Sequence, residues 1–122
     1  MSFRPGGGQA APLQDQVPMQ AKKFIDDVSA SNASLLALYA QGRQGQTRLG
    51  AMLDALALAD GQRQQVLAMI KLAIDDTTYQ LVCGIEGSAS LGDSQQDYTL
   101  LDEEGNTLTG ALDSLLYDRL NT

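Results

Sequence analysis

The sequence predicts an α+β fold that is predominantly helical: a bundle of four to five helices with one small antiparallel β-hairpin before the last helix. Apolar residues recur at spacings of three, four and seven along much of residues 19–85, and again over residues 111–120. This is the period of an amphipathic helix. Between these stretches, two short extended segments flank a Gly-Asn pair at residues 105–106, a pattern typical of a hairpin.

The chain is long enough for one domain, since it has 122 residues. All three prolines and a run of three glycines lie within the first 18 residues. Such a segment buries too little apolar surface to offset the entropy lost on ordering. We therefore predict a flexible N-terminal tail over residues 1–18, with a docking arm as the alternative, and a single helical domain over residues 19–122.

The first helix is expected to follow Pro18 and to end at Gly42 and Gly45, because glycine commonly terminates helices. Its apolar face consists of Phe24, Ile25, Val28, Leu35, Leu36 and Tyr39. A polar stretch interrupts this face, and Ser31 or Asn32 within it is expected to kink the helix or to cap a second one.

Two further helices are predicted before residue 86. Thr47 is suited to cap a short helix whose stripe is Leu49, Met52, Leu53 and Leu56. The Asp60-Gly61 pair predicts a turn. The next helix, from about Gln62 to Ile85, has the most regular pattern of the chain. Its stripe is Val66, Met69, Ile70, Ala73, Ile74, Thr77, Leu81 and Ile85.

The C-terminal part alternates loop, hairpin and helix. Residues 87–94 are rich in Gly and Ser and predict a loop. Residues 98–102 and 107–109 are the predicted hairpin strands, joined by residues 103–106, and residues 111–120 are the last helix. A two-stranded hairpin is marginally stable alone. It is therefore expected to pack on the helices or to pair with a strand of a partner.

The composition excludes several classes of site. The chain has no His and one Cys, so it can form neither a Ser-His-Asp or Cys-His triad, nor a zinc site built on His or several Cys, nor an internal disulfide. A calcium loop that starts at Asp102 would place Gly105 at position 4, where position 6 is required. We expect no metal, no cofactor and no enzymatic activity, and we expect Cys83 to be a buried structural thiol.

A cytoplasmic location is expected. No apolar run approaches the ~18–20 residues of a membrane span, and residues 1–20 lack the apolar core of a secretory signal. A single Cys also suits a reducing compartment. No membrane is therefore expected as a partner.

Charge is the most informative feature of the sequence. The chain holds 8 Lys and Arg against 15 Asp and Glu, a formal net charge of −7. Residues 72–122 hold ten of these acids and only one base, Arg119. Such a field steers a basic protein toward its binding face and disfavours the phosphate backbone of nucleic acid. An ordinary solubilising surface is the alternative.

The predicted partner-binding residues lie on the hairpin and its flanks. They are Asp97, Tyr98, Asp102, Glu103, Glu104 and Tyr117. The four acids would supply charge that complements a basic partner, and the two tyrosines would serve as aromatic anchors.

Residues 66–120 resemble small acidic bacterial immunity proteins, which neutralise a cognate toxin. The likeness lies in a long helix that ends in Cys83-Gly84-Ile85-Glu86-Gly87, a Gly/Ser loop, an acidic hairpin over residues 98–106 and a Leu-rich helix with Tyr117. The resemblance implies a non-catalytic binding protein that docks on a basic toxin.

Four other functions remain open at this stage. A secretion chaperone or adaptor predicts a homodimer that holds an extended segment. A nucleic-acid mimic predicts acids regularly spaced on one face, and an enzyme predicts a pocket with convergent carboxylates. The fourth is a structural domain without a further role.

Overall fold

The computed structural model describes residues 18–122, and the predicted tail, apart from Pro18, lies outside them. The elements are α2 (Met19–Ala40), the 3₁₀ helix η1 (Gly42–Gly45), α3 (Arg48–Ala55), α4 (Asp60–Glu86) and α5 (Leu112–Leu120). The prediction of a predominantly helical fold is confirmed for this part of the chain. None of these helices is long and apolar enough to cross a membrane.

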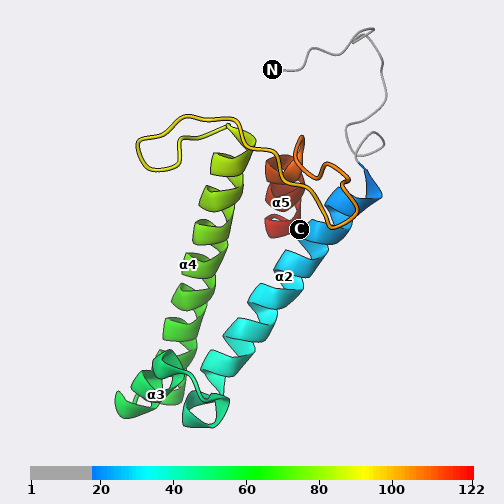
Figure 1. Ribbon diagram of the computed structural model, residues 1–122. Coiled ribbons are helices and arrows are strands. Elements are labelled where there is room, and N and C mark those ends of the chain that lie inside the picture. Colours follow the sequence, from blue (N-terminus) through cyan, green and yellow to red (C-terminus); the bar gives the residue numbers. More distant parts are fainter. Residues whose placement is uncertain (1–17) are drawn as a thin grey trace, which may run out of the picture.

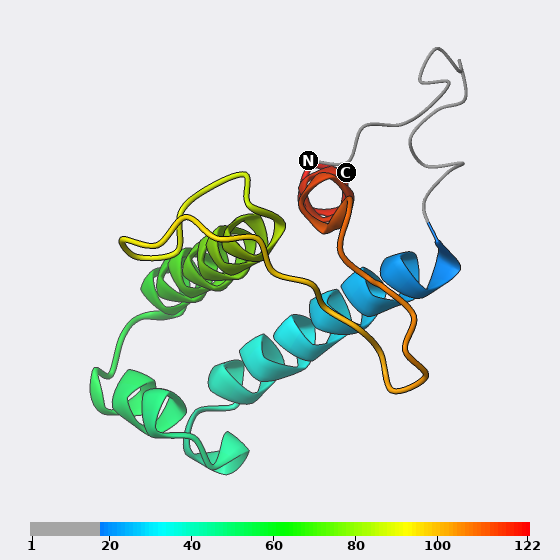
Figure 2. The ribbon, with the colours of Figure 1, turned by 45° about the horizontal axis from the view of Figure 1, so that its top comes forward.

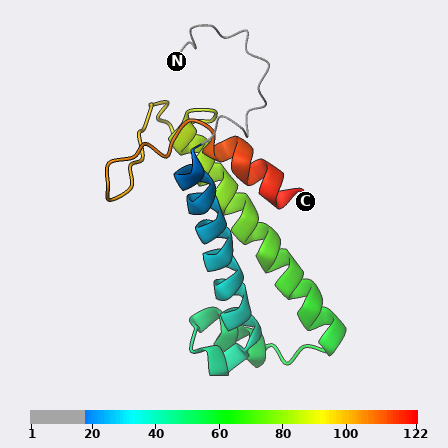
Figure 3. The same cartoon turned by 90° about the vertical axis from the view of Figure 1, so that its right-hand side faces the viewer.

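Two long antiparallel helices form the frame of the molecule. Helices α2 and α4 run in opposite directions and cross at an angle (Figures 1 and 3). Helix α5 packs at the end where α2 begins and α4 ends, whereas η1 and α3 lie at the opposite end. The two ends of the frame are therefore filled by different elements.

The core lies where α2, α4 and α5 meet. Its buried cluster is Ala21, Ile25, Val82, Leu112 and Leu116, and the half-buried Phe24, Tyr79, Leu100 and Leu115 pack against it. The α5 residues Leu112 and Leu116 are 0% and 1% exposed. Three leucines of the predicted last helix, Leu112, Leu115 and Leu116, thus face the core. Their burial holds α5 against the two long helices.

The predicted β-hairpin is wrong, and no strand forms within residues 18–122. Residues 98–109 form a loop with one isolated antiparallel bridge, Leu101 to Thr107. A two-stranded ladder contributes little stability by itself. The segment instead places Leu108 in a buried position and half-buries Leu100 against the helical core.

Two helix boundaries also differ from prediction. Helix α2 continues through Ser31 and Asn32 without a break, because the Asn32 side chain donates a hydrogen bond to Thr78 Oγ1 of α4 at 2.9 Å. Helix α4 begins at Asp60, and the Gln62 side chain accepts from the Ala59 N–H at 3.2 Å. The predicted turn at Asp60-Gly61 is wrong, since the chain turns earlier.

The predicted stripe of α4 is only partly covered. Val66, Ile70 and Ile74 are half-buried, but Met69 and Leu81 are 67% and 51% exposed. Toward its C-terminus the helix buries Val82 and Cys83 instead, because α5 packs on a different side of this half. The prediction of a buried Cys83 thiol is confirmed.

Candidate functional site: an acidic loop and an apolar groove

The segment between α4 and α5, residues 88–110, is named here the acidic loop. It holds Asp93, Asp97, Asp102, Glu103 and Glu104 and no Lys or Arg. In Figure 2 it extends from the end of α4 across α2 and returns to α5. It therefore connects α4 to α5 across the surface of the helical frame.

Apolar contacts anchor the acidic loop near both of its ends. Leu108 is buried. Leu91 packs so closely on Gly84 of α4 that an added Cβ at Gly84 would overlap the Leu91 side chain. The glycine inside α4, which is unfavourable in a helix by itself, is thus explained by close packing of the acidic loop.

Glu86, the last residue of α4, caps the start of α5. Its carboxylate accepts hydrogen bonds from the N–H groups of Gly110 and Leu112, both at 2.8 Å. Ala111 precedes α5 and has no side chain that could do this, and a negative group is favourable at a helix N-terminus. Ser88 adds a second tie, donating to Asp113 Oδ2 at 2.8 Å. Glu86 and Asp113 therefore connect the end of α4 to the start of α5.

Asp102 organises the tip of the acidic loop. One carboxylate oxygen accepts from the N–H groups of Glu104 (3.0 Å) and Asn106 (2.8 Å), and the other accepts from Asn106 Nδ2 at 3.0 Å. The hydrogen bonds from the Asn106 side chain and backbone hold the pKa of Asp102 below its ordinary value of 3.8. The carboxylate is therefore engaged within its own turn.

Four other carboxylates of the loop have no hydrogen bond or ion pair with any residue that the structure describes. They are Asp93, Asp97, Glu103 and Glu104, and all are exposed. Tyr98 and Leu101, between them in sequence, are also exposed. The structure thus places five of the six predicted partner-binding residues on one segment.

Tyr117, the sixth predicted residue, lies apart on α5. Its ring packs against Tyr79 of α4, with ring centroids 6.1 Å apart and planes tilted by 50°. A hydrogen bond with the Cys83 thiol raises the pKa of Tyr79. Tyr117 therefore packs on the helical frame. Within residues 18–122 it has no hydrogen bond or ring contact with the loop tip.

Acidification is expected to destabilise the loop tip. Because the folded pKa of Asp102 is lowered, its contribution to stability is present above about pH 3.8 and is lost as the pH falls through the folded pKa. Asp102→Asn should therefore lower stability at pH 7 and flatten the change in urea midpoint between pH 5 and pH 2.5. Glu103→Gln is the matched control and should show the same change in urea midpoint as the wild type. Identical profiles for the two variants would contradict the role of Asp102.

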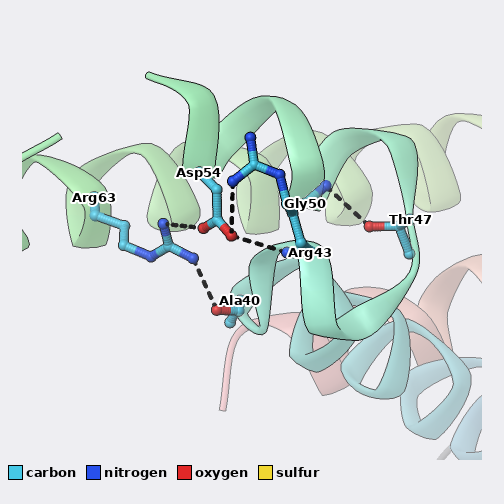
Figure 4. A network of polar contacts seen from close by, with 6 residues as sticks. All are labelled: Ala40, Arg43, Thr47, Gly50, Asp54 and Arg63. Carbon is cyan, nitrogen blue, oxygen red and sulfur yellow. Dashed lines mark hydrogen bonds and ion pairs between the residues drawn. The ribbon is translucent and has the colours of Figure 1, made fainter. Parts of the chain in front are cut away.

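At the other end of the molecule, Asp54 of α3 joins three elements (Figure 4). One of its oxygens accepts from the Arg43 N–H of η1 and the other from Arg63 of α4, both at 2.9 Å, while Arg63 also donates to the Ala40 carbonyl at the end of α2. The hydrogen bonds from the Arg43 backbone and the Arg63 side chain lower the pKa of Asp54. Thr47 caps α3 by accepting from the Gly50 N–H at 2.9 Å, as predicted.

This network holds α3 beside α4 with an apolar groove between them. The groove has a volume of about 490 Å³ and is lined by Arg48, Leu49, Met52, Leu53, Leu56, Val66 and Ile70. Met52 and Leu56 are 67% and 61% exposed. The predicted stripe of α3 therefore covers only part of the surface that it shares with α4.

A cavity of about 360 Å³, lined by both polar and apolar side chains, lies between α2, α4 and α5. The charged groups at its edge are paired: Lys71 with Asp75 at 2.8 Å, and Arg119 with Asp26. Within residues 18–122, no three side chains of the His, Cys, Asp or Glu type gather in a way that could hold a metal ion.

Comparison with known proteins adds no relative. No protein family, no curated protein and no solved structure matches the chain. Sequence reasoning missed the structural roles of Asp54 and Glu86. A signal for Glu86 was the absence of a capping side chain before α5.

Proposed function

We propose that the protein is a non-catalytic binding protein whose acidic loop docks on a basic protein. The observation that supports this most is the set of four carboxylates, Asp93, Asp97, Glu103 and Glu104, which no base within residues 18–122 neutralises. Most bases elsewhere in this part of the chain pair with acids outside the loop. The loop, with five acids and no base, therefore carries most of the net negative charge of −7.

The acids and the apolar residues of the loop have different roles in this proposal. Exposed acids raise the rate of association with a basic surface and make it dependent on salt. Tyr98 and Leu101 supply the apolar area that becomes buried in the complex. Asp102 shapes the tip, and Glu86 and Leu108 hold the loop on the frame, so that little entropy is lost when the partner binds.

An immunity protein that neutralises a toxin is the form of this function that we favour. An inhibitor of this kind needs fast association, which a concentrated negative charge provides. We then expect the partner to be a basic protein that is harmful when produced alone and harmless when this chain is produced with it.

Charge reversal at the loop tip tests the docking function. Glu103→Lys/Glu104→Lys should slow association with the basic partner about tenfold or more at low salt and reduce the salt dependence of binding. The partner is obtained by capture on the tagged full chain from a lysate of its native cell at low salt, and the rates are then measured with the purified pair by stopped flow. Asp102 is kept, because its replacement would disturb the turn.

The control variant, Asp27→Lys/Asp76→Lys, makes the same change in net charge at exposed positions on α2 and α4. The ion pair that it removes, Lys23 to Asp27, is exposed and contributes little to stability. The control should bind at nearly the wild-type rate. Equal decreases in association rate for the two variants would mean that net charge alone causes the effect. An unchanged association rate for the tip variant would overturn the docking proposal.

A further inference from the structure

A small pocket between α4 and α5 brings two tyrosines and two acids together. It has a volume of about 200 Å³ and is lined by Tyr79, Asp113, Ser114, Tyr117 and Asp118. The rings of Tyr79 and Tyr117 pack against each other with their planes tilted by 50°. Within residues 18–122, none of the side chains that line the pocket is Lys or Arg. The pocket therefore combines aromatic surface with negative charge.

The carboxylate of Asp113 can accept a further donor in this pocket. It accepts hydrogen bonds from the Ser88 hydroxyl at 2.8 Å and from the Ser114 N–H at 2.9 Å, and both of these donors are uncharged. A carboxylate has about four acceptor sites, so sites remain for a cation. The charge also reaches the adjacent ring. A hydrogen bond with the Cys83 thiol is the main cause that raises the pKa of Tyr79, and the charge of Asp113 adds to the rise.

From this pocket we infer that α4 and α5 together bind an arginine side chain of the basic partner. The inference rests on the docking function proposed above and adds a second contact to it. A guanidinium group is planar, so it can stack on an aromatic ring and donate to a carboxylate at the same time. A lysine ammonium is more strongly hydrated and loses more when it leaves water. Arginine therefore matches the two tyrosines and Asp113 better than lysine does.

The size and position of the pocket favour a side chain of a protein over a free small molecule. Sites for whole ligands have volumes of roughly 300–1,000 Å³, more than this pocket offers. The α-carboxylate of free arginine would also be repelled by Asp113. Ser88, the first residue of the acidic loop, donates to Asp113, so the pocket adjoins the start of that loop. One partner can therefore contact the acidic loop and the pocket together.

The exposure of Tyr117 agrees with the role of an aromatic anchor. Tyr117 is 55% exposed, whereas Tyr79 is half-buried, so a guanidinium that stacks on Tyr117 covers aromatic surface that is open in the free chain. Anchors that become buried slow the dissociation of a complex, whereas exposed acids mainly raise the rate of association. The pocket and the acidic loop should therefore affect different rate constants.

Titration of the isotopically labelled full chain with N-acetyl-arginine methylamide tests the pocket itself. At constant ionic strength, we expect saturable shifts of the amide signals of residues 113–118 with a Kd of about 10 mM, since one cation on an aromatic face contributes little free energy. The neutral compound N-acetyl-citrulline methylamide, which has the same shape, should cause no saturable shift.

Substitutions of Tyr117 test the part that its ring plays. Tyr117→Leu should weaken binding of the arginine compound about threefold or more, whereas Tyr117→Phe, which keeps the ring, should bind nearly as the wild type does. Tyr39→Leu makes the same change on α2, outside the pocket, and should leave binding unchanged. Unchanged helical circular dichroism would establish that each variant is folded.

The dissociation rate of the complex tests whether the partner uses the pocket. With the purified basic partner, Tyr117→Leu should raise the dissociation rate about threefold or more and leave the association rate and its salt dependence nearly unchanged. The loop-tip variant Glu103→Lys/Glu104→Lys should instead slow association.

No saturable shift with the arginine compound, or an equal shift with the citrulline compound, would overturn the pocket. A wild-type dissociation rate for Tyr117→Leu would overturn its use by the partner. Failure of the docking function would be seen in a different measurement, as an unchanged association rate for the loop-tip variant.

Discussion

Leu112→Ala is expected to destabilise the protein by about 3–5 kcal/mol, the range for deletion of a large side chain from a packed core. Leu112 is 0% exposed and belongs to the cluster that joins α5 to α2 and α4. The substitution leaves a cavity that the rigid long helices cannot fill. Urea unfolding followed by circular dichroism should show a lower midpoint with little change in slope.

Leu101→Ala is the control for this prediction. It removes the same atoms from a side chain that is 52% exposed, so its cost should not exceed about 0.5 kcal/mol. Similar midpoints for the two variants would contradict the position of the core. The two variants also distinguish two roles within the C-terminal part of the chain. Leu112 stabilises the helical core, whereas Leu101 is exposed on the acidic loop.

Gly42→Ala is expected to have the second large effect. Gly42 has a φ of +63°, and an L-residue in this conformation costs roughly 1–2 kcal/mol. An added Cβ would also overlap the Asp54 carboxylate, which accepts hydrogen bonds from Arg43 and Arg63. The variant should therefore lose more stability than backbone strain alone predicts, and the amides of α3 should exchange faster with solvent.

Gly61→Ala provides the comparison. Gly61 lies in the first turn of α4, and no atom lies within 4 Å of the position that its Cβ would occupy. Alanine is preferred to glycine in helices by up to about 1 kcal/mol, so this variant should be neutral or slightly stabilised. If Gly42→Ala were equally well tolerated, the Asp54 network would not hold α3 in place.

The regular helices and their caps were open to prediction because the interactions that form them are local. The repeat of apolar residues indicated α2, α4 and α5, and Thr47 indicated the start of α3. The sequence also showed five acids and no base in the segment between α4 and α5. The three errors of element type and boundary lay at Ser31-Asn32, at Asp60-Gly61 and at residues 98–109. At Ser31-Asn32 and at residues 98–109, contacts with distant parts of the chain, such as the hydrogen bond from Asn32 to Thr78 and the packing of Leu100 on the core, prevail over the local signals.

The candidate site could be predicted only in part. Sequence placed Asp97, Tyr98, Glu103 and Glu104 on one segment, and the structure leaves them exposed there. It treated Asp102 as another displayed charge, but the hydrogen bonds of Asp102 lie within its own turn. Which carboxylate is engaged depends on the position of backbone N–H groups, and composition does not carry that information.

The sequence by itself determined that the chain is mainly helical, that its negative charge is concentrated near the C-terminus, and that α4 has a broad apolar face. Only the tertiary structure decided how much of that face the chain covers. Helix α5 occupies one side of α4 near its end, and Asp54 holds α3 near its start, so Met69 and Leu81 remain exposed. Helical period depends on neighbours along the chain, whereas burial depends on which distant elements reach each face.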